Sequence, residues 1–142
     1  MARTSFNGPV ASANGFIGGH QVTTANAVNA TGTATAAQVA TGYITSTSAG
    51  ATTIQLPTGT ALGSLIGAVR GTSLDLYIDN TAGASTVTVS VNTGAVLSSG
   101  AVDASAAAGT FGDLTIAAGA TGIGRFTLMF SSPTAYVFTR TA

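Results

Sequence analysis

Hydrophobic and polar residues alternate most regularly between Ser73 and Asp79. The even-numbered positions are Leu74, Leu76 and Ile78, and the odd-numbered positions carry Ser, Asp or Tyr. Successive side chains of a β-strand point to opposite faces, so this pattern predicts a strand with one buried face and one exposed face.

A second alternating segment follows at 86–91, where Val occupies every second position after the turn-forming residues 80–84. These two segments are expected to form an antiparallel pair. The shorter runs 43–47 and 52–56 predict another such pair joined by a short turn. Pro57 closes the second run because it cannot donate to a strand ladder.

The second half of the chain carries more short apolar segments between clusters of turn residues. Residues 98–112 are rich in Ser, Gly and Ala and predict a long surface loop. Further short strands are expected at 96–97, 114–116, 126–130 and 136–140.

Two segments have helical features. Residues 33–41 predict a short helix that is stopped by the glycine after it. Residues 58–67 begin with a threonine suited to an N-cap and end in glycine. Inside this segment the i, i+3, i+4 spacing of Leu62, Leu65 and Ile66 predicts one apolar helix face.

About seven or eight short strands separated by turn clusters are typical of an antiparallel sandwich or small barrel. The predicted fold class is therefore all-β: a small antiparallel β-sandwich or jelly-roll-like barrel with one or two short helical turns. We expect this domain to span residues 33–142, after an extended N-terminal arm over residues 1–32.

The predicted arm is rich in Gly, Asn and Ala, has no regular period, and contains isolated large apolar residues. Such side chains would gain nothing in a solvated tether, whereas burying one contributes about 1.5–3 kcal/mol. We therefore expect the arm to bind a partner through Phe6, Val10, Phe16 and Ile17.

Charged residues make up 6% of the chain, against about 25% of an ordinary soluble domain, and Lys and Glu are absent. A free monomer keeps its sheet edges and faces apart from neighbours with charged side chains, above all Lys. The composition therefore favours a protein whose surfaces are covered by partners. Ser and Thr hydroxyls can also hydrate a charge-poor surface, so a free monomer stays open at this point.

Several function classes lack the residues that they require. The formal net charge is zero and the four Arg residues are scattered, which argues against nucleic-acid binding. Cysteine is absent, which excludes a disulfide framework and a thiolate metal site. The sequence has neither an apolar run of membrane-spanning length nor a secretory signal, so we expect a soluble chain that is not exported.

Patterns typical of catalytic and metal sites are also missing. The single histidine, His20, has no Ser or carboxylate partner near it in the sequence. Asp75 and Asp79 share a strand face but lie about 13 Å apart, wider than the roughly 5–9.5 Å between glycosidase carboxylates. We predict no enzyme activity, no cofactor, no metal site and no small-molecule substrate.

The charged residues suit structural roles better. Asp79, Asn80 and Thr81 predict a turn in which an Asp or Asn side chain bonds the backbone ahead. Polar contacts between subunits are expected from the scattered charges, with Asp103 as a further acidic partner; the candidates are Arg70, Asp75, Asp79, Arg125 and Arg140.

The order of these features resembles a known family. A helical turn ending in Gly67 is followed by GTSLDLYIDNT at 71–81, STVTV at 85–89, DLTIAAG at 113–119, FTLMF at 126–130 and AYVF at 135–138. Across roughly residues 33–142 this is similar to the small β-rich decoration (cement) or head-fibre proteins of tailed bacteriophages.

The resemblance implies a homotrimer on the outer surface of a phage capsid, made in the host cytoplasm and incorporated into the virion. Such a trimer clamps neighbouring capsomers of the major capsid protein, and an arm often reaches along the shell. The alternative function is a trimeric fibre or adhesin tip that holds a host surface glycan on loops such as 98–112.

Overall fold

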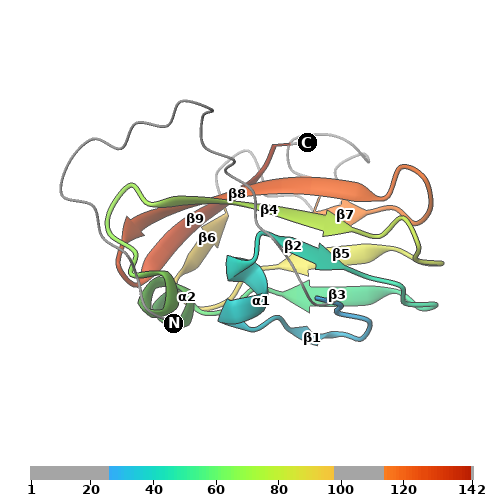
Figure 1. Ribbon diagram of the computed structural model, residues 1–142, viewed down its shortest axis with the longest axis horizontal. Coiled ribbons are helices and arrows are strands. Elements are labelled where there is room, and N and C mark those ends of the chain that lie inside the picture. Colours follow the sequence, from blue (N-terminus) through green and yellow to red (C-terminus); the bar gives the residue numbers. More distant parts are fainter. Residues whose placement is uncertain (1–25, 98–113, 142) are drawn as a thin grey trace, which may run out of the picture.

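The computed structural model describes residues 26–97 and 114–141, which form two β-sheets packed face to face (Figure 1). The four-stranded sheet has the order β1-β3-β5-β7, and the five-stranded sheet has the order β2-β4-β8-β9-β6. The elements are β1 (Gly32–Thr33), α1 (Ala36–Ala40), β2 (Tyr43–Thr45), β3 (Thr52–Gln55), α2 (Gly59–Ile66), β4 (Ser73–Asp79), β5 (Val87–Ser90), β6 (Ala95–Leu97), β7 (Thr115–Ile116), β8 (Ile123–Ser132) and β9 (Ala135–Arg140).

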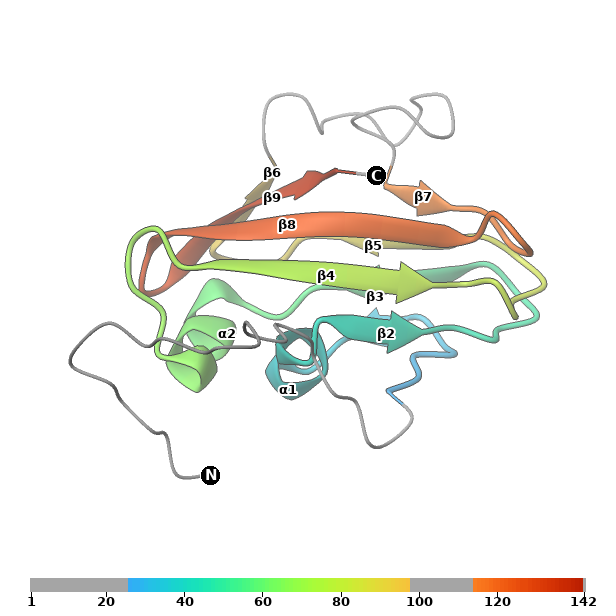
Figure 2. The same ribbon diagram turned by 45° about the horizontal axis from the view of Figure 1, so that its top comes forward.

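Successive strands from β1 to β8 alternate between the two sheets, and only β8 and β9 follow each other within one sheet (Figure 2). Two strands that are neighbours in a sheet are therefore often separated by a complete circuit of the chain. Three such pairs, β1/β3, β3/β5 and β2/β4, run in the same direction. The β6/β9 pair is also parallel, whereas β4/β8, β5/β7 and β8/β9 are antiparallel.

The prediction of an all-β antiparallel sandwich or jelly-roll-like barrel is therefore wrong. Both sheets mix parallel and antiparallel strands, and the fold is α+β, with 41% of the described residues in strands and 13% in helices.

Both predicted hairpins are wrong for the same reason. The segment 43–47 contains β2 and the segment 52–56 contains β3, which lie in different sheets, as do β4 and β5. Alternation identifies the buried face of each strand, and this face is the same whether the next strand pairs beside it or packs opposite it. Here the next strand packs opposite, so side chains meet where backbone hydrogen bonds were expected.

Helix α1 confirms the helix predicted within 33–41. Thr35 caps it by accepting a hydrogen bond from the backbone N–H of Gln38, and the Gln38 side chain accepts one from the backbone N–H of Thr35. This reciprocal capping box satisfies two donors that a helix start otherwise leaves unpaired. Val39 is fully buried, so the short helix is held against the sheets by packing as well as by its cap.

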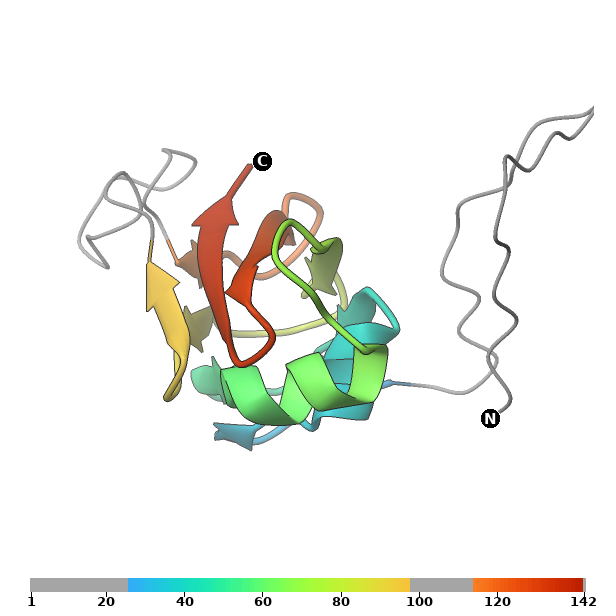
Figure 3. The same cartoon turned by 90° about the vertical axis from the view of Figure 1, so that its left-hand side faces the viewer.

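Helix α2 confirms the helix predicted within 58–67, including its Thr58 cap. Its buried face differs from the expected one, because Leu62 is fully buried whereas Leu65 is 54% exposed. The helix instead faces the sheets with Gly63, where an added Cβ atom would lie 1.9 Å from the carbonyl oxygen of Pro133. A residue without a side chain thus lets α2 lie directly against the β8–β9 turn, across one end of the sandwich (Figure 3).

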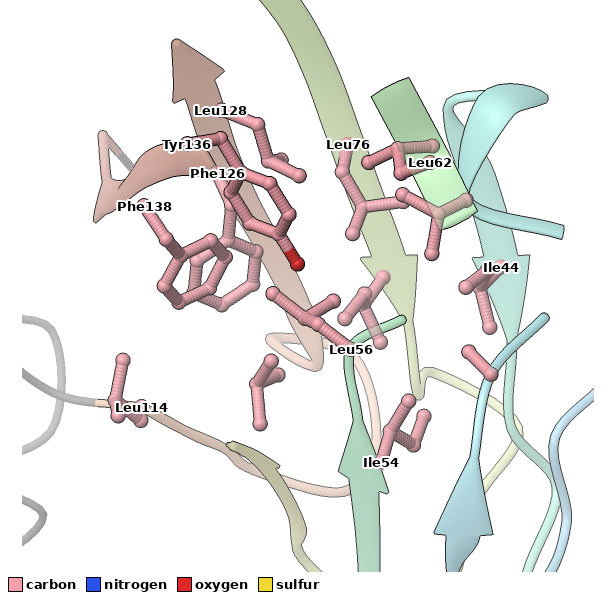
Figure 4. Packing of buried hydrophobic residues seen from close by; sticks show 14 of the residues in the cluster. Ile44, Ile54, Leu56, Leu62, Leu76, Leu114, Phe126, Leu128, Tyr136 and Phe138 are labelled. Atoms are coloured by element: carbon pink, nitrogen blue, oxygen red, sulfur yellow. The ribbon is translucent and has the colours of Figure 1, made fainter. Parts of the chain in front are cut away.

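The hydrophobic core fills the space between the sheets with the inward-facing residues of both (Figure 4). The rings of Phe126 and Phe138 stack with centroids 4.9 Å apart. Tyr136 places its ring in the same core and donates a 2.8 Å hydrogen bond from its hydroxyl to the Pro57 carbonyl. Burial raises the pKa of Tyr136, so its hydroxyl stays a neutral donor.

A buried asparagine ties the two sheets together where β4 ends. Asn80 is fully buried and donates from Nδ2 to the carbonyls of Ser85, just before β5, and Ala117, just after β7. Its backbone N–H donates to Gly122 next to β8. The turn that leaves the five-stranded sheet is thus fixed to the four-stranded sheet by hydrogen bonds from a side chain that is itself fully buried.

Candidate functional site

The five-stranded sheet presents a mixed aromatic, charged and apolar surface on its outer side. The register places Tyr43 beside Tyr77, and Tyr77 beside Arg125, in one row across β2, β4 and β8. We call this surface the tyrosine face and define it by the residues on it that project outward: Tyr43, Asp75, Tyr77, Asp79, Ile123, Arg125, Thr127 and Met129.

Arg125 organises the centre of the tyrosine face. Its Nη2 donates a 2.7 Å hydrogen bond to Oδ2 of Asp75, and its guanidinium carbon lies 5.7 Å from the centre of the Tyr77 ring. Thr127 donates to the other carboxylate oxygen of Asp75. The hydrogen bond that Arg125 donates to Asp75 raises the pKa of Arg125, so the guanidinium stays charged at neutral pH. These contacts hold the arginine and the tyrosine in one arrangement before any partner arrives.

Asp79 organises the end of the same face. It accepts hydrogen bonds at Oδ1 from the backbone N–H and hydroxyl of Thr81, and at Oδ2 from the Tyr43 hydroxyl at 2.5 Å. The Thr81 hydroxyl, followed by the Tyr43 hydroxyl, lowers the pKa of Asp79. The same contact with Asp79 raises the pKa of Tyr43. The predicted side-chain turn at residues 79–81 is confirmed, and Asp79 is its acceptor.

The two remaining predicted arginines differ in their surroundings. Arg140 is only 8% exposed, donates to the Thr115 carbonyl across the sheets, and lies with its guanidinium 5.9 Å from the Phe126 ring centre. Arg70 is exposed in the connection between α2 and β4. Of the five predicted charges, the structure brings Asp75, Asp79 and Arg125 together on one face and places Arg140 inside the fold.

Other predicted residues lie outside the part of the chain that the structure describes. These are His20, Asp103, the loop predicted at 98–112, and the arm anchors Phe6, Val10, Phe16 and Ile17. Residues 26–32, at the end of the predicted arm, do contact the sheets through the Ala27–Thr45 bridge and through Gly32 of β1. The contacts predicted between subunits and through the arm remain predictions.

Sequence reasoning missed most apolar members of the tyrosine face. Ile123 and Met129 are 52% and 54% exposed, and Tyr43 is exposed beside Tyr77. Their signal was available, because Met129 occupies the polar phase of the alternating segment 126–130. Single exposed apolar side chains are common, whereas several gathered on one sheet face indicate a binding surface for a partner.

The described residues contain no group of three or more His, Cys, Asp or Glu side chains that could hold a metal ion. Within 26–97 and 114–141, neither helix has the length and apolar composition needed to cross a membrane. The site that the structure offers is therefore a surface of aromatic rings, one ion pair and hydroxyls.

Comparison with family models, curated proteins and solved structures gave no significant match to this chain.

Proposed function

We propose that this chain is a structural virion protein that binds the outer surface of a phage capsid as a homotrimer and stabilises contacts between capsomers of the major capsid protein. The observation that carries the proposal is the tyrosine face, in a chain with 6% charged residues and no Lys. The assignment to a capsid comes from the resemblance to decoration and head-fibre proteins.

The composition of the tyrosine face suits protein binding. Tyr, Met and Arg are enriched in the cores of protein interfaces, and Lys and Glu are depleted. Tyr77 and Arg125 contact each other and Arg125 is tied to Asp75, so little side-chain freedom is left to lose when a partner binds. A rigid aromatic and arginine pair of this kind is a suitable anchor for a complementary protein surface.

The mechanism is passive and involves no turnover. A subunit that bridges two capsomers adds an interface that must be broken before the shell opens under the pressure of packaged DNA. The stabilisation follows from binding the closed shell more tightly than the opened one.

A second candidate function is a fibre or adhesin tip that binds a host surface glycan. One observation favours it: two exposed tyrosine rings lie side by side within reach of carboxylates and hydroxyls, which can supply ring stacking and hydrogen bonds to a sugar. Asp79 and Asp75 already use both of their oxygens as acceptors inside the chain, so fewer acceptor positions are left for sugar hydroxyls.

The test uses undecorated shells of the cognate phage, heated with and without the full-length protein. We expect saturable binding and a higher shell opening temperature. Saturable binding without any stabilisation, or binding to glycans while shells are ignored, would overturn the capsid function and favour the adhesin. Light scattering of the free protein should give the mass of three chains.

A further inference from the structure

Two charges in the described part of the chain have no oppositely charged side chain as a partner. Asp75 is paired with Arg125, and Arg140 is engaged inside the fold. Arg70 is exposed and forms no ion pair, and Asp79 is bonded only by the neutral groups of Tyr43 and Thr81. One positive and one negative charge are thus left over in a domain that has very few.

These two charges lie at opposite ends of the molecule. Arg70 precedes β4 and Asp79 is its last residue, and Figure 2 shows the two ends of this strand at opposite ends of the sheet. The strand alone keeps them about 20 Å apart. They therefore cannot pair within one chain, but they can pair between two copies.

Each charge also has exposed apolar neighbours. Arg70 follows Val69, which is 63% exposed, and Leu65 at the end of α2 is exposed as well. Asp79 is the register partner of the exposed Ile123. We call Leu65, Val69 and Arg70 the basic patch, and Tyr43, Asp79 and Ile123 the acidic patch.

Both patches are held in a fixed conformation. The basic patch includes a turn in which the Thr72 N–H donates to the Val69 carbonyl and the Val69 N–H donates to the Thr72 hydroxyl. Gly71 has a φ of 87° at the third position, as a type II turn requires, which leaves Arg70 at the outer corner. In the acidic patch, three hydrogen bonds to Asp79 fix the carboxylate.

We propose that copies of this chain bind head to tail, with the basic patch of one copy against the acidic patch of the next and with Arg70 beside Asp79. The two patches differ in sign, so each copy offers one of each, and the contact is heterologous. Such a contact closes into a ring when the rotation between copies allows it. The inference rests on the assembly function proposed above, and it names the contact that builds the oligomer.

The test is sedimentation velocity over a concentration series, with four variants of the full-length protein. Arg70→Glu reverses one charge at an exposed side chain that forms no hydrogen bond or ion pair with the described residues, so the fold should be unaffected. Asp79→Asn removes the other charge but keeps an acceptor for Thr81. Arg70→Glu with Asp79→Lys exchanges the two charges. Gln55→Glu, on the outer side of β3, is the control because it adds a charge on the four-stranded sheet, which contains none of the patch residues.

We expect Arg70→Glu and Asp79→Asn each to raise the dissociation constant of self-association at least tenfold, which corresponds to about 1.4 kcal/mol. The exchanged double variant should return to within about threefold of the original, and Gln55→Glu should match the original. Raising salt from 50 to 500 mM should weaken self-association of the original protein and leave self-association of Arg70→Glu nearly unchanged.

Association of Arg70→Glu that equals the original would overturn this contact. So would a folded double variant that stays as weak as the single ones. If the exchanged double variant fails to fold, Arg70→Glu and the salt series still test the contact, because Arg70→Glu changes only an exposed side chain.

Failure of this contact can be told apart from failure of the proposed function. If the original protein stays monomeric in solution but still stabilises shells, the head-to-tail contact and the free homotrimer are both ruled out, while the shell-stabilising function stands. If the protein associates through Arg70 but does not bind shells, the proposed function is ruled out while the head-to-tail contact is supported.

Discussion

The outer faces of the two sheets are built by the same alternation but carry different chemistry. The five-stranded sheet exposes the tyrosine face, with aromatic rings, an ion pair and apolar side chains. The four-stranded sheet exposes only hydroxyl and amide side chains, which we call the threonine face: Thr33, Thr53, Gln55, Thr88, Ser90 and Thr115. A row of Thr residues across β3, β5 and β7 takes the place of the row of Tyr and Arg across β2, β4 and β8.

The difference shows that the inward residues determine folding, whereas the outward residues determine binding. The inward positions of both sheets are almost all apolar, with Thr52 and Arg140 as the exceptions, so the sandwich forms without regard to what faces outward. Hydroxyls hydrate the threonine face at little cost, whereas large apolar groups on the tyrosine face gain free energy when a partner covers them. A partner should therefore bind the tyrosine face and leave the threonine face in solvent.

The outer faces of the two sheets can differ in chemistry without disturbing the fold only if the sheets keep their relative position. Asn80 holds that position. We expect Asn80→Ala to lower the free energy of unfolding by about 2–3 kcal/mol, because the fully buried Asn80 side chain is removed and the carbonyls of Ser85 and Ala117 lose their donor. Urea titration followed by circular dichroism measures this. Asn92→Ala is the matched control, since that side chain bonds only the adjacent backbone, and it should cost less than about 1 kcal/mol. Equal losses in the two variants would mean that Asn80 is not the tie between the sheets.

Shell binding should divide the two faces directly. We expect Tyr77→Ala to weaken binding to undecorated shells at least tenfold, because it removes an exposed ring at the centre of the tyrosine face. Thr88→Ala, at the centre of the threonine face, should stay within about twofold of the original. Titration of labelled protein against shells measures both. A larger loss of affinity in Thr88→Ala than in Tyr77→Ala would mean that the shell binds the threonine face and not the tyrosine face.

Arg125→Gln sharpens the same comparison, because it separates affinity from stability. The guanidinium and Asp75 are both well exposed, so solvent screens the pair and the urea midpoint should not move within error. Affinity for shells should fall about three- to fivefold, because the side chain that orients Tyr77 no longer carries its charge. A lowered midpoint with unchanged affinity would make the pair a folding element only.

The sequence predicted local features well because their causes are local. The alternation at 73–79 identified a strand and its buried face, and residues at 79–81 and Thr58 predicted a turn and a helix cap from chemistry that acts within four residues. The outward position of Asp75 and Tyr77 followed from the same period of two.

Pairing between strands lay beyond this reasoning, because it depends on contacts that are distant in sequence. Asp75 and Arg125 meet only because β8 lies beside β4, fifty residues away along the chain. A strand that packs opposite its predecessor and one that pairs beside it have the same pattern, so the parallel pairs were not predictable. Leu65 was misplaced because Gly63, rather than a large side chain, makes the closest approach of α2 to the β8–β9 turn.

The smallest expected difference between the faces is their response to pH, and Tyr43→Phe tests it. In the folded chain the pKa of Asp79 is below its ordinary value of 3.8, so its contribution is present above about pH 4 and is lost as the pH falls through the lowered value. The pKa of Tyr43 is above its ordinary value of 10.0, so its contribution is present below pH 10 and is lost as the pH rises through the raised value.

Because both groups are largely solvated, each contribution should amount to only a few tenths of a kcal/mol. Tyr43→Phe should abolish the loss of unfolding free energy that Tyr43 causes at alkaline pH. It should reduce the loss at acid pH only in part, since Thr81 is the larger cause of the lowered pKa of Asp79. The measurement is the difference in unfolding free energy between variant and original, at pH 3, 7 and 10.5. Thr88→Val on the threonine face should give a difference that does not depend on pH, because the described residues of that face include no titratable side chain. If that control changed with pH as Tyr43→Phe does, the acid and alkaline losses would belong to the whole fold, and the tyrosine face would have no electrostatic character of its own.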